Sequence, residues 1–162
     1  MSPNREKALT NIKTWLVENK WRAIQVEDDE YAFHLEVMPK SDRALPFDIL
    51  ASKKVESILV CWSWALYEED RKAIRMIDSK VKEKFAAEVK SGFNLMNLPI
   101  VFYKSPKDLQ VIHTQKTIKL DQLTKESLLN GFNELIQALE FTSRKFIDHF
   151  SMPVEFDPSS HV

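Results

Sequence analysis

The first apolar stripe of the chain has the spacing of an amphipathic helix. Apolar residues recur at intervals of three and four positions from Ala8 to Leu16, and this periodicity predicts a helix that ends near Asn19. Ser2 is suited to cap the start of this helix, and Pro3 fits the first helical position, where no backbone N–H is needed. The chain is therefore expected to open with a helix that turns one apolar face toward a core.

Strict alternation of apolar and polar residues follows, and it is typical of strands. Residues 31–38 alternate in this way, so we expect a half-buried antiparallel strand with His34 and Glu36 on its solvated outer face. Shorter strands are predicted on either side of it, at 21–26 and 47–51.

The segment from Val55 to Trp64 is apolar on both of its faces. Trp62 and Trp64 share one face, and Cys61 lies on the other. Such a strand belongs in the middle of a sheet, where both faces are covered. An aromatic sheet face can also stack nucleic-acid bases, but this segment carries no Lys or Arg to hold phosphates. We therefore interpret the two indoles as core residues.

Helical periodicity returns at Glu68. One apolar face continues to Val89, which predicts a single helix over this stretch, and Gly92 stands where the end of a helix favours a positive φ. A hairpin is predicted next, with strands at 93–103 and 109–118. Because Pro99 cannot donate to a strand ladder, we expect the first of these strands at an edge of the sheet or interrupted.

The last predicted element is a long helix from Thr124, its expected cap, to Phe150. Its apolar stripe is longer than one face of a sheet usually covers, because strands span roughly 17–20 Å and this helix about 40 Å. The surplus residues form a candidate interaction surface: Phe141, Phe146, Ile147 and Phe150. Either a partner or second copy covers them, or the N-terminal helix does, and the sequence leaves both interpretations open.

The predicted order of elements, α-β-β-β-β-α-β-β-α, defines the fold class. Strands grouped in runs of four and two indicate an α+β protein with an antiparallel sheet of five to six strands and helices packed on the sheet. We expect residues 1–150 to form a single domain. Residues 151–162 carry two prolines and little periodicity, which predicts a flexible C-terminal tail.

Charge and composition exclude several classes of protein. The chain has 162 residues and a formal net charge of −1, so it lacks the basic excess of nucleic-acid-binding proteins. Its apolar runs are too short to cross a bilayer, and we expect no membrane association. The single cysteine cannot form an intramolecular disulfide, which favours a cytoplasmic location.

Few side chains are suited to catalysis or to holding a cofactor. Of the two glycines, Gly92 and Gly131, neither lies in a pattern that cradles phosphate. His34 and Glu36 offer two metal ligands where a site needs three or four, and the apolar surroundings of Cys61 disfavour a thiolate. We therefore predict no catalytic residue, no metal site and no cofactor.

The layout resembles the type III secretion chaperone-like fold, a group that includes an uncharacterised, mainly archaeal family of small domains and the bacterial sensory-transduction-regulator proteins. The resemblance covers residues 3–150 and rests on the order of elements: the opening helix with Trp15 and Leu16, the strand 21–26 with its acidic turn, the alternation at 31–37, and the long helices around the last hairpin. It implies a protein that binds other proteins, often as a dimer, and that lacks a catalytic centre. Secretion chaperones proper tend to be smaller and strongly acidic, so only the binding role carries over.

Two hypotheses about function follow. The first is a non-enzymatic protein-interaction domain, chaperone-like or regulatory, that binds itself as a homodimer or binds a partner chain through apolar surface. The alternative is a small-molecule-binding or enzymatic domain with a pocket between sheet and helix, built from His34, Glu36, His113 or Cys61.

Overall fold

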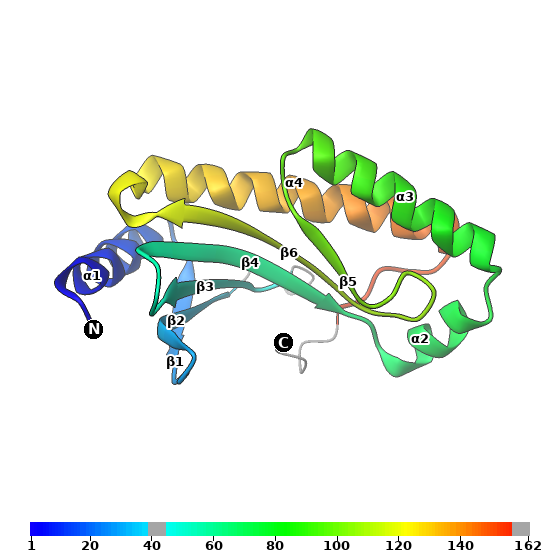
Figure 1. Cartoon of the computed structure of the whole chain (residues 1–162), viewed down its shortest axis with the longest axis horizontal. Helices are drawn as coiled ribbons and strands as arrows, with labels where there is room; N and C mark the ends of the chain where they lie inside the picture. Colours follow the sequence, from blue (N-terminus) through cyan, green and yellow to red (C-terminus); the bar gives the residue numbers. More distant parts are fainter. Residues whose placement is uncertain (39–44, 157–162) are drawn as a thin grey trace. The chain divides into compact units, whose positions relative to one another are not determined.

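The computed structural model describes residues 1–38 and 45–156. Within them the elements follow the order α1 (Pro3–Glu18), β1 (Arg22–Val26), β2 (Tyr31–Met38), β3 (Phe47–Ser52), β4 (Ser57–Ala65), α2 (Glu68–Arg75), α3 (Ser79–Leu95), β5 (Ile100–Lys104), β6 (Leu109–Lys119), the 3₁₀ turn η1 (Leu120–Gln122) and α4 (Lys125–Phe150) (Figure 1). The strands form a six-stranded sheet in the order β1-β2-β3-β4-β6-β5. The pairs β1–β2, β2–β3, β3–β4 and β5–β6 are antiparallel, so the predicted α+β class and element types are confirmed.

Contacts along the chain divide it into two compact units. Unit 1 contains residues 1–62 and 116–133, and unit 2 contains residues 63–115 and those from 134 onward. β4, β6 and α4 each contribute to both units. The single domain expected over residues 1–150 stays a prediction.

Unit 1 builds its core from α1, the first strands and the start of α4. The alternation predicted for residues 31–38 is present in β2, and β3 shows the same pattern: inward side chains are buried while the others are half-exposed. Phe132 of α4 stacks on Phe47 of β3, with ring centroids 5.6 Å apart, and Trp21 packs against both rings. Aromatic packing of this kind adds to the free energy gained from burying apolar area.

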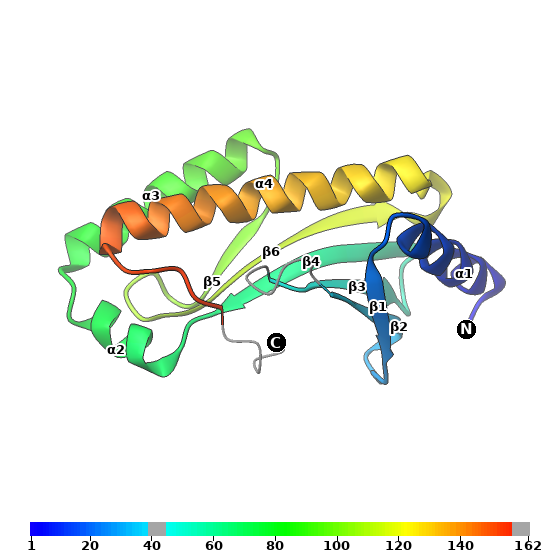
Figure 2. The same ribbon diagram turned by 180° about the vertical axis from the view of Figure 1, so that it is seen from behind.

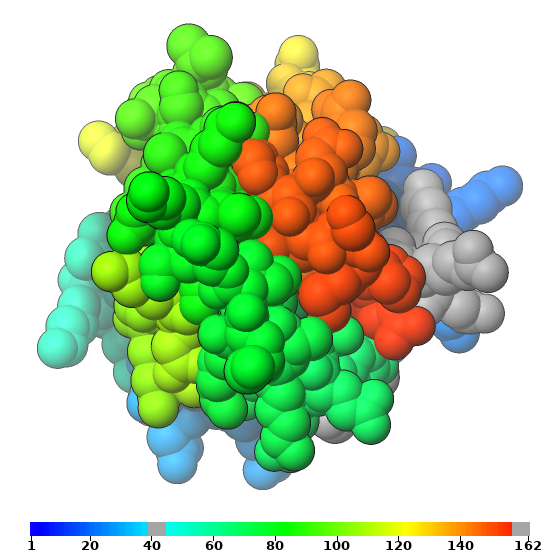
Figure 3. Space-filling model, turned by 90° about the vertical axis from the view of Figure 1, so that its right-hand side faces the viewer, coloured from blue at the N-terminus to red at the C-terminus, as the bar shows by residue number. Residues whose placement is uncertain are grey.

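Unit 2 has a second aromatic cluster between the end of β4 and the helices α3 and α4. Trp64 lies 4.9 Å from Phe146 between ring centroids, and Phe85 of α3 lies 4.8 Å from Phe150. Figure 3 shows α3, in green, and the end of α4, in orange, side by side on one face of this unit.

The helix predicted from Glu68 to Val89 is wrong in its continuity, because two helices occupy this stretch. α2 ends at Arg75, and α3 begins after Asp78, whose carboxylate accepts a hydrogen bond from the backbone N–H of Lys80 at 2.7 Å. An aspartate that caps a helix satisfies an N–H group that would otherwise lack a partner, and this favours a new start. The apolar stripe keeps its helical period from α2 into α3, so the hydrophobic pattern alone does not show that the helix is interrupted.

Gly92 does not end a helix, and this expectation is also wrong. α3 continues to Leu95, no glycine has a positive φ, and the left-handed backbone that follows this helix belongs to Asn97 (φ 55°). The strand predicted from residue 93 consequently begins only at Ile100, directly after Pro99. It does lie at the edge of the sheet, as the proline predicted.

The end of the chain is described as far as Phe156, and residues 157–162 of the predicted tail lie outside the described residues. The flexibility expected for residues 151–162 stays a prediction. No helix in the described parts combines the length and the apolar character that crossing a bilayer requires.

Candidate interaction site

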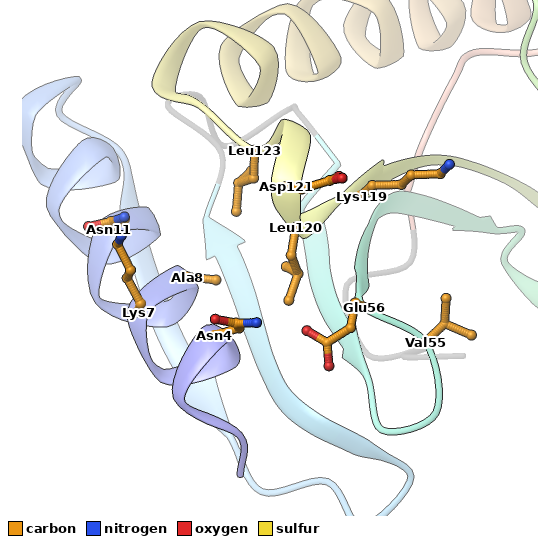
Figure 4. Close-up of a pocket in the computed structure, with 10 residues that line it drawn as sticks. All are labelled: Asn4, Lys7, Ala8, Asn11, Val55, Glu56, Lys119, Leu120, Asp121 and Leu123. Atoms are coloured by element: carbon orange, nitrogen blue, oxygen red, sulfur yellow. The ribbon is translucent and has the colours of Figure 1, made fainter.

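A groove of about 780 Å³ runs along α1 in unit 1 (Figure 4). One wall is α1, the other is the segment that joins β3 to β4, and η1 with its flanking residues closes the third side. The lining residues are Asn4, Lys7, Ala8, Asn11, Val55, Glu56, Lys119, Leu120, Asp121 and Leu123.

Arg5 fixes the distance between the two walls. Its side chain is largely buried and donates hydrogen bonds to the carbonyl oxygens of Ser52 (2.8 Å), Lys53 (3.3 Å) and Val55 (3.3 Å). A guanidinium nitrogen also lies 2.9 Å from a carboxylate oxygen of Glu56. Because a guanidinium presents several donors in a rigid plane, one residue holds the whole 52–56 segment against α1.

The third side of the groove is tied to the same segment. The backbone N–H of Leu120 donates to the carbonyl oxygen of Glu56 at 2.9 Å. Figure 4 shows the side chains of Ala8, Leu120 and Leu123 turned into the groove. Both hydrogen-bonded contacts meet at residues 55–56, so the groove has a fixed shape before anything binds.

The lining combines an apolar floor with a rim of both charges. Val55 is 61% exposed on the groove wall, which is unusual for a valine beside a buried anchor. Lys7, Glu56, Lys119 and Asp121 are among the lining residues, so charged residues of both signs border the groove. Apolar area flanked by charged groups of both signs suits a polypeptide segment, since the floor supplies affinity and the rim supplies orientation.

His34 is the sequence-predicted residue that the structure places most differently from expectation. Instead of lying on a solvated face, its ring stands between two carboxylates, with Nδ1 3.0 Å from Asp28 and Nε2 2.7 Å from Asp48. Both ring nitrogens can donate at once only when the imidazole is protonated. A backbone N–H donated by Glu30, and then the hydrogen bond to His34, lower the pKa of Asp28.

This arrangement joins the turn before β2 to β3 and leaves the imidazole no free nitrogen for a ligand. Glu36 lies further along β2, opposite Ile24 and Asp48 in the register. Among the described residues, no group of three or more His, Cys, Asp or Glu side chains is placed to hold a metal ion.

The other polar candidates lie in separate places. Cys61 is buried in β4, and burial, followed by the charge of Asp48, raises the pKa of its thiol to about 12. A thiol held protonated in this way is a poor nucleophile. His113 of β6 makes a 2.8 Å contact from Nδ1 to the hydroxyl of Ser63. Trp62 and Trp64 are both fully buried, as the sequence indicated.

Only some of the residues predicted to form a surface on the last helix are exposed in the structure. Phe146 and Phe150 are buried in the core of unit 2 against Trp64 and Phe85, so the expectation that they form surface is wrong. Their cover comes from β4 and α3. Ile147 is 47% exposed, and Phe141 is half-buried.

The α1 groove was not predicted from the sequence, although one signal for it exists. Arg5 stands three residues before Ala8, on the same helical face as Ile12 and Leu16, all of which are buried. A basic residue inside a buried apolar stripe calls for a set of polar partners. Those partners come from a segment about fifty positions away, which no local pattern reveals.

These elements and their order define an α+β protein with the type III secretion chaperone-like fold. The chain belongs to the family described as "Uncharacterized conserved protein (DUF2299)", whose model matches residues 8–146. No curated protein has a significant match to its sequence.

Solved structures that share the fold include those of three other proteins. An uncharacterized protein from Methanothermobacter thermautotrophicus has a TM-score of 0.76 and 21% identity, over 86% of this chain and 96% of that one. A chain of the ExsC-ExsE complex has a TM-score of 0.61 and 14% identity, over 89% and 96%. YbjN from E. coli has a TM-score of 0.51 and 11% identity, over 87% and 92%.

Proposed function

We propose that this chain is a non-enzymatic protein-interaction domain that binds a segment of a partner protein in the α1 groove. The observation that carries the proposal is the groove itself, with its apolar floor, its rim of both charges and its rigid anchor at Arg5. A fixed groove limits the conformational entropy lost on binding, because its walls are already ordered. The protein complex formed by ExsC and ExsE, one chain of which has this fold, supports a protein as partner.

Two charge reversals on α1 test this proposal. Lys7→Glu alters the rim of the groove, whereas Lys13→Glu makes the same change on the opposite face of the helix, where Lys13 contacts Gln25. Each variant and the parent chain are used to recover proteins from a lysate of the source cells, followed by quantitative mass spectrometry. We expect a protein retained by the parent and by Lys13→Glu to fall at least tenfold with Lys7→Glu. Equal retention by both variants would contradict the proposal.

Self-association through the edge strand β5 is a second candidate. Val101 and Tyr103 share one face of this strand and are 42% and 45% exposed. If two copies of β5 paired antiparallel about Phe102, Val101 of each would stand opposite Tyr103 of the other. Pairs of an aromatic and a β-branched residue stabilise antiparallel strands, and the match of one patch to itself suits a twofold dimer.

A cytoplasmic location is the remaining part of the proposal. The chain has one cysteine, and its thiol is buried and has a raised pKa. Disulfide-rich frameworks of secreted domains require several paired cysteines, so the composition supports a reducing compartment.

A further inference from the structure

The segment after α4 turns back onto unit 2 and lies against the end of β4. α4 ends at Phe150, and Ser151 adopts a left-handed backbone with φ 52°, which is uncommon for a residue with a side chain. Its N–H donates to the carbonyl oxygen of Ile147 at 2.8 Å. Figure 2 shows the segment, in red, leaving α4 and returning toward β4. We call residues 151–156 the C-terminal strap.

Two side-chain donors of unit 2 hold the backbone of the strap. The indole N–H of Trp64 donates to the carbonyl oxygen of Glu155 at 3.1 Å, and the Tyr67 hydroxyl donates to that of Phe156 at 2.8 Å. The Phe156 ring packs edge-on against Trp64, with centroids 5.3 Å apart. Every residue has a carbonyl, so only the aromatic ring in this set of contacts depends on the strap's sequence.

One side chain of the strap works against its attachment. Glu155 lines a shallow polar pocket of about 490 Å³ at the start of α2, together with the three carboxylates of Glu68, Glu69 and Asp70 and with Lys72, which pairs with Glu68 at 3.5 Å. Burial, and then the charges of Glu155 and Glu69, raise the pKa of Asp70. Like charges gathered in this way repel one another. Two neutral hydrogen bonds, one ring contact and the half-buried side chains of Met152 and Val154 therefore hold the strap, and its own carboxylate opposes them.

We infer that Trp64 and Tyr67 form a docking site for an extended segment of a partner protein, and that the strap is its intramolecular occupant. The incoming segment carries an aromatic residue at the place of Phe156 and a lysine or arginine at the place of Glu155. The aromatic ring would pack on Trp64, and the basic side chain would meet the acidic start of α2. This site lies wholly in unit 2 and does not depend on the α1 groove.

Labelled synthetic peptides test the inference on the full-length chain by fluorescence anisotropy. One has the sequence of residues 151–156, a second carries Glu155→Lys, and a third carries Glu155→Lys with Phe156→Ala. We expect the second peptide to bind at least tenfold tighter than the first, and the third to lose binding at least tenfold relative to the second. Equal affinity of the first two peptides, or no binding by any peptide, would overturn the inference.

Variants of the chain locate the site and show the competition. Phe156→Ala in the chain weakens the strap and is expected to raise affinity for the second peptide at least threefold, whereas Glu155→Lys tightens the strap and is expected to lower it. The strap and the peptide share the Tyr67 donor, so Tyr67→Phe is tested in the Phe156→Ala chain, where the strap is weakened, and is expected there to lower peptide affinity. If Glu155→Lys leaves the affinity unchanged, the strap does not occupy the peptide's site and the inference fails.

The same peptide separates this inference from the proposed function. If Lys7→Glu weakens binding of the peptide, and Tyr67→Phe in the Phe156→Ala chain does not, the peptide binds in the α1 groove. That result would overturn the docking site at Trp64 and Tyr67 while leaving the proposed function standing.

Discussion

Gly92 of α3 lies directly against the ring of Phe141 of α4. A Cβ atom placed at Gly92 would come within 2.3 Å of Cζ of Phe141 and 2.4 Å of Cε1. The glycine therefore serves close approach of two helices and not backbone freedom, since no glycine here has a positive φ. This contact explains why a residue with poor helix propensity stands inside α3.

In Gly92→Ala the added methyl group must displace the Phe141 ring, at a cost of about 1–3 kcal/mol. The gain in helix propensity, up to about 1 kcal/mol, offsets part of this cost, and the net effect is predicted to be destabilising. Gly131→Ala in α4 is the matched control. The Cβ there would lie 3.7 Å from Ile118, an ordinary contact, so alanine is expected to stabilise by up to about 1 kcal/mol. Chemical denaturation measures both. If Gly92→Ala leaves the free energy of unfolding unchanged, the close contact between Gly92 and the Phe141 ring would be contradicted.

Arg5→Met is predicted to destabilise unit 1 by about 2–4 kcal/mol, because three backbone carbonyls and Glu56 lose a buried cationic donor. Arg5→Lys is expected to recover only part of the loss, since an ammonium cannot reproduce the planar set of donors. Arg144→Ala, at an exposed position of α4, is the control and is expected to change stability by less than about 0.5 kcal/mol. Hydrogen exchange adds a local readout: residues 52–56 should exchange faster in Arg5→Met, and unchanged rates there would argue against the clamp.

The Glu88 carboxylate predicts a pH dependence of stability. A 2.8 Å hydrogen bond from His149, and then the contact with Lys145 at 3.3 Å, lower its pKa in the folded chain. The Glu88 carboxyl therefore binds a proton less tightly in the folded chain than in the unfolded chain. The stabilisation is present above the usual carboxyl pKa and is lost as pH falls through the lowered value.

Glu88→Gln should consequently make the fall in stability below about pH 5 less steep than in the parent chain. Glu140→Gln, at an exposed position of α4, provides the control, because the structure gives it no such pair. Thermal unfolding across the acid range measures the slopes. Parallel curves for the parent and Glu88→Gln would show that the ion pair does not affect stability.

Val101→Lys is predicted to prevent self-association through β5, because a charge on an edge strand opposes pairing with another edge. Val17→Lys places the same change at a 74% exposed valine of α1 and should leave the oligomeric state unaltered. Analytical ultracentrifugation at micromolar concentration compares the masses. A parent chain that sediments as a monomer would remove this candidate.

The sequence predicted the elements better than it predicted their ends. Period-two alternation located β2, and the apolar character of β4 indicated burial on both faces, because these patterns directly reflect which side chains face the core. The sequence pattern does not reveal the break at Asp78, because the apolar stripe resumes in phase after it. The sequence left cover by a partner or by the N-terminal helix open for Phe146 and Phe150, whereas α3 and β4 cover them in the structure.

The candidate sites depend on contacts between distant parts of the chain, and this is why the sequence did not indicate them. Arg5 meets the 52–56 segment, and Trp64 meets Glu155, in each case across many positions with no shared periodicity. Every residue has a backbone carbonyl, so the sequence of the accepting segment does not show that a side chain donates a hydrogen bond to it. Only the donor side can be recognised, as a polar residue in an apolar pattern.

The most direct test of the α1 groove as a protein-binding site is site-specific photo-crosslinking in source cells. A photoreactive residue replaces Lys7 at the rim of the groove or, in a second strain, Lys13 on the opposite face of α1. The account predicts one discrete crosslinked protein from position 7 and no matching product from position 13. No product at position 7, or the same products at both positions, would contradict it.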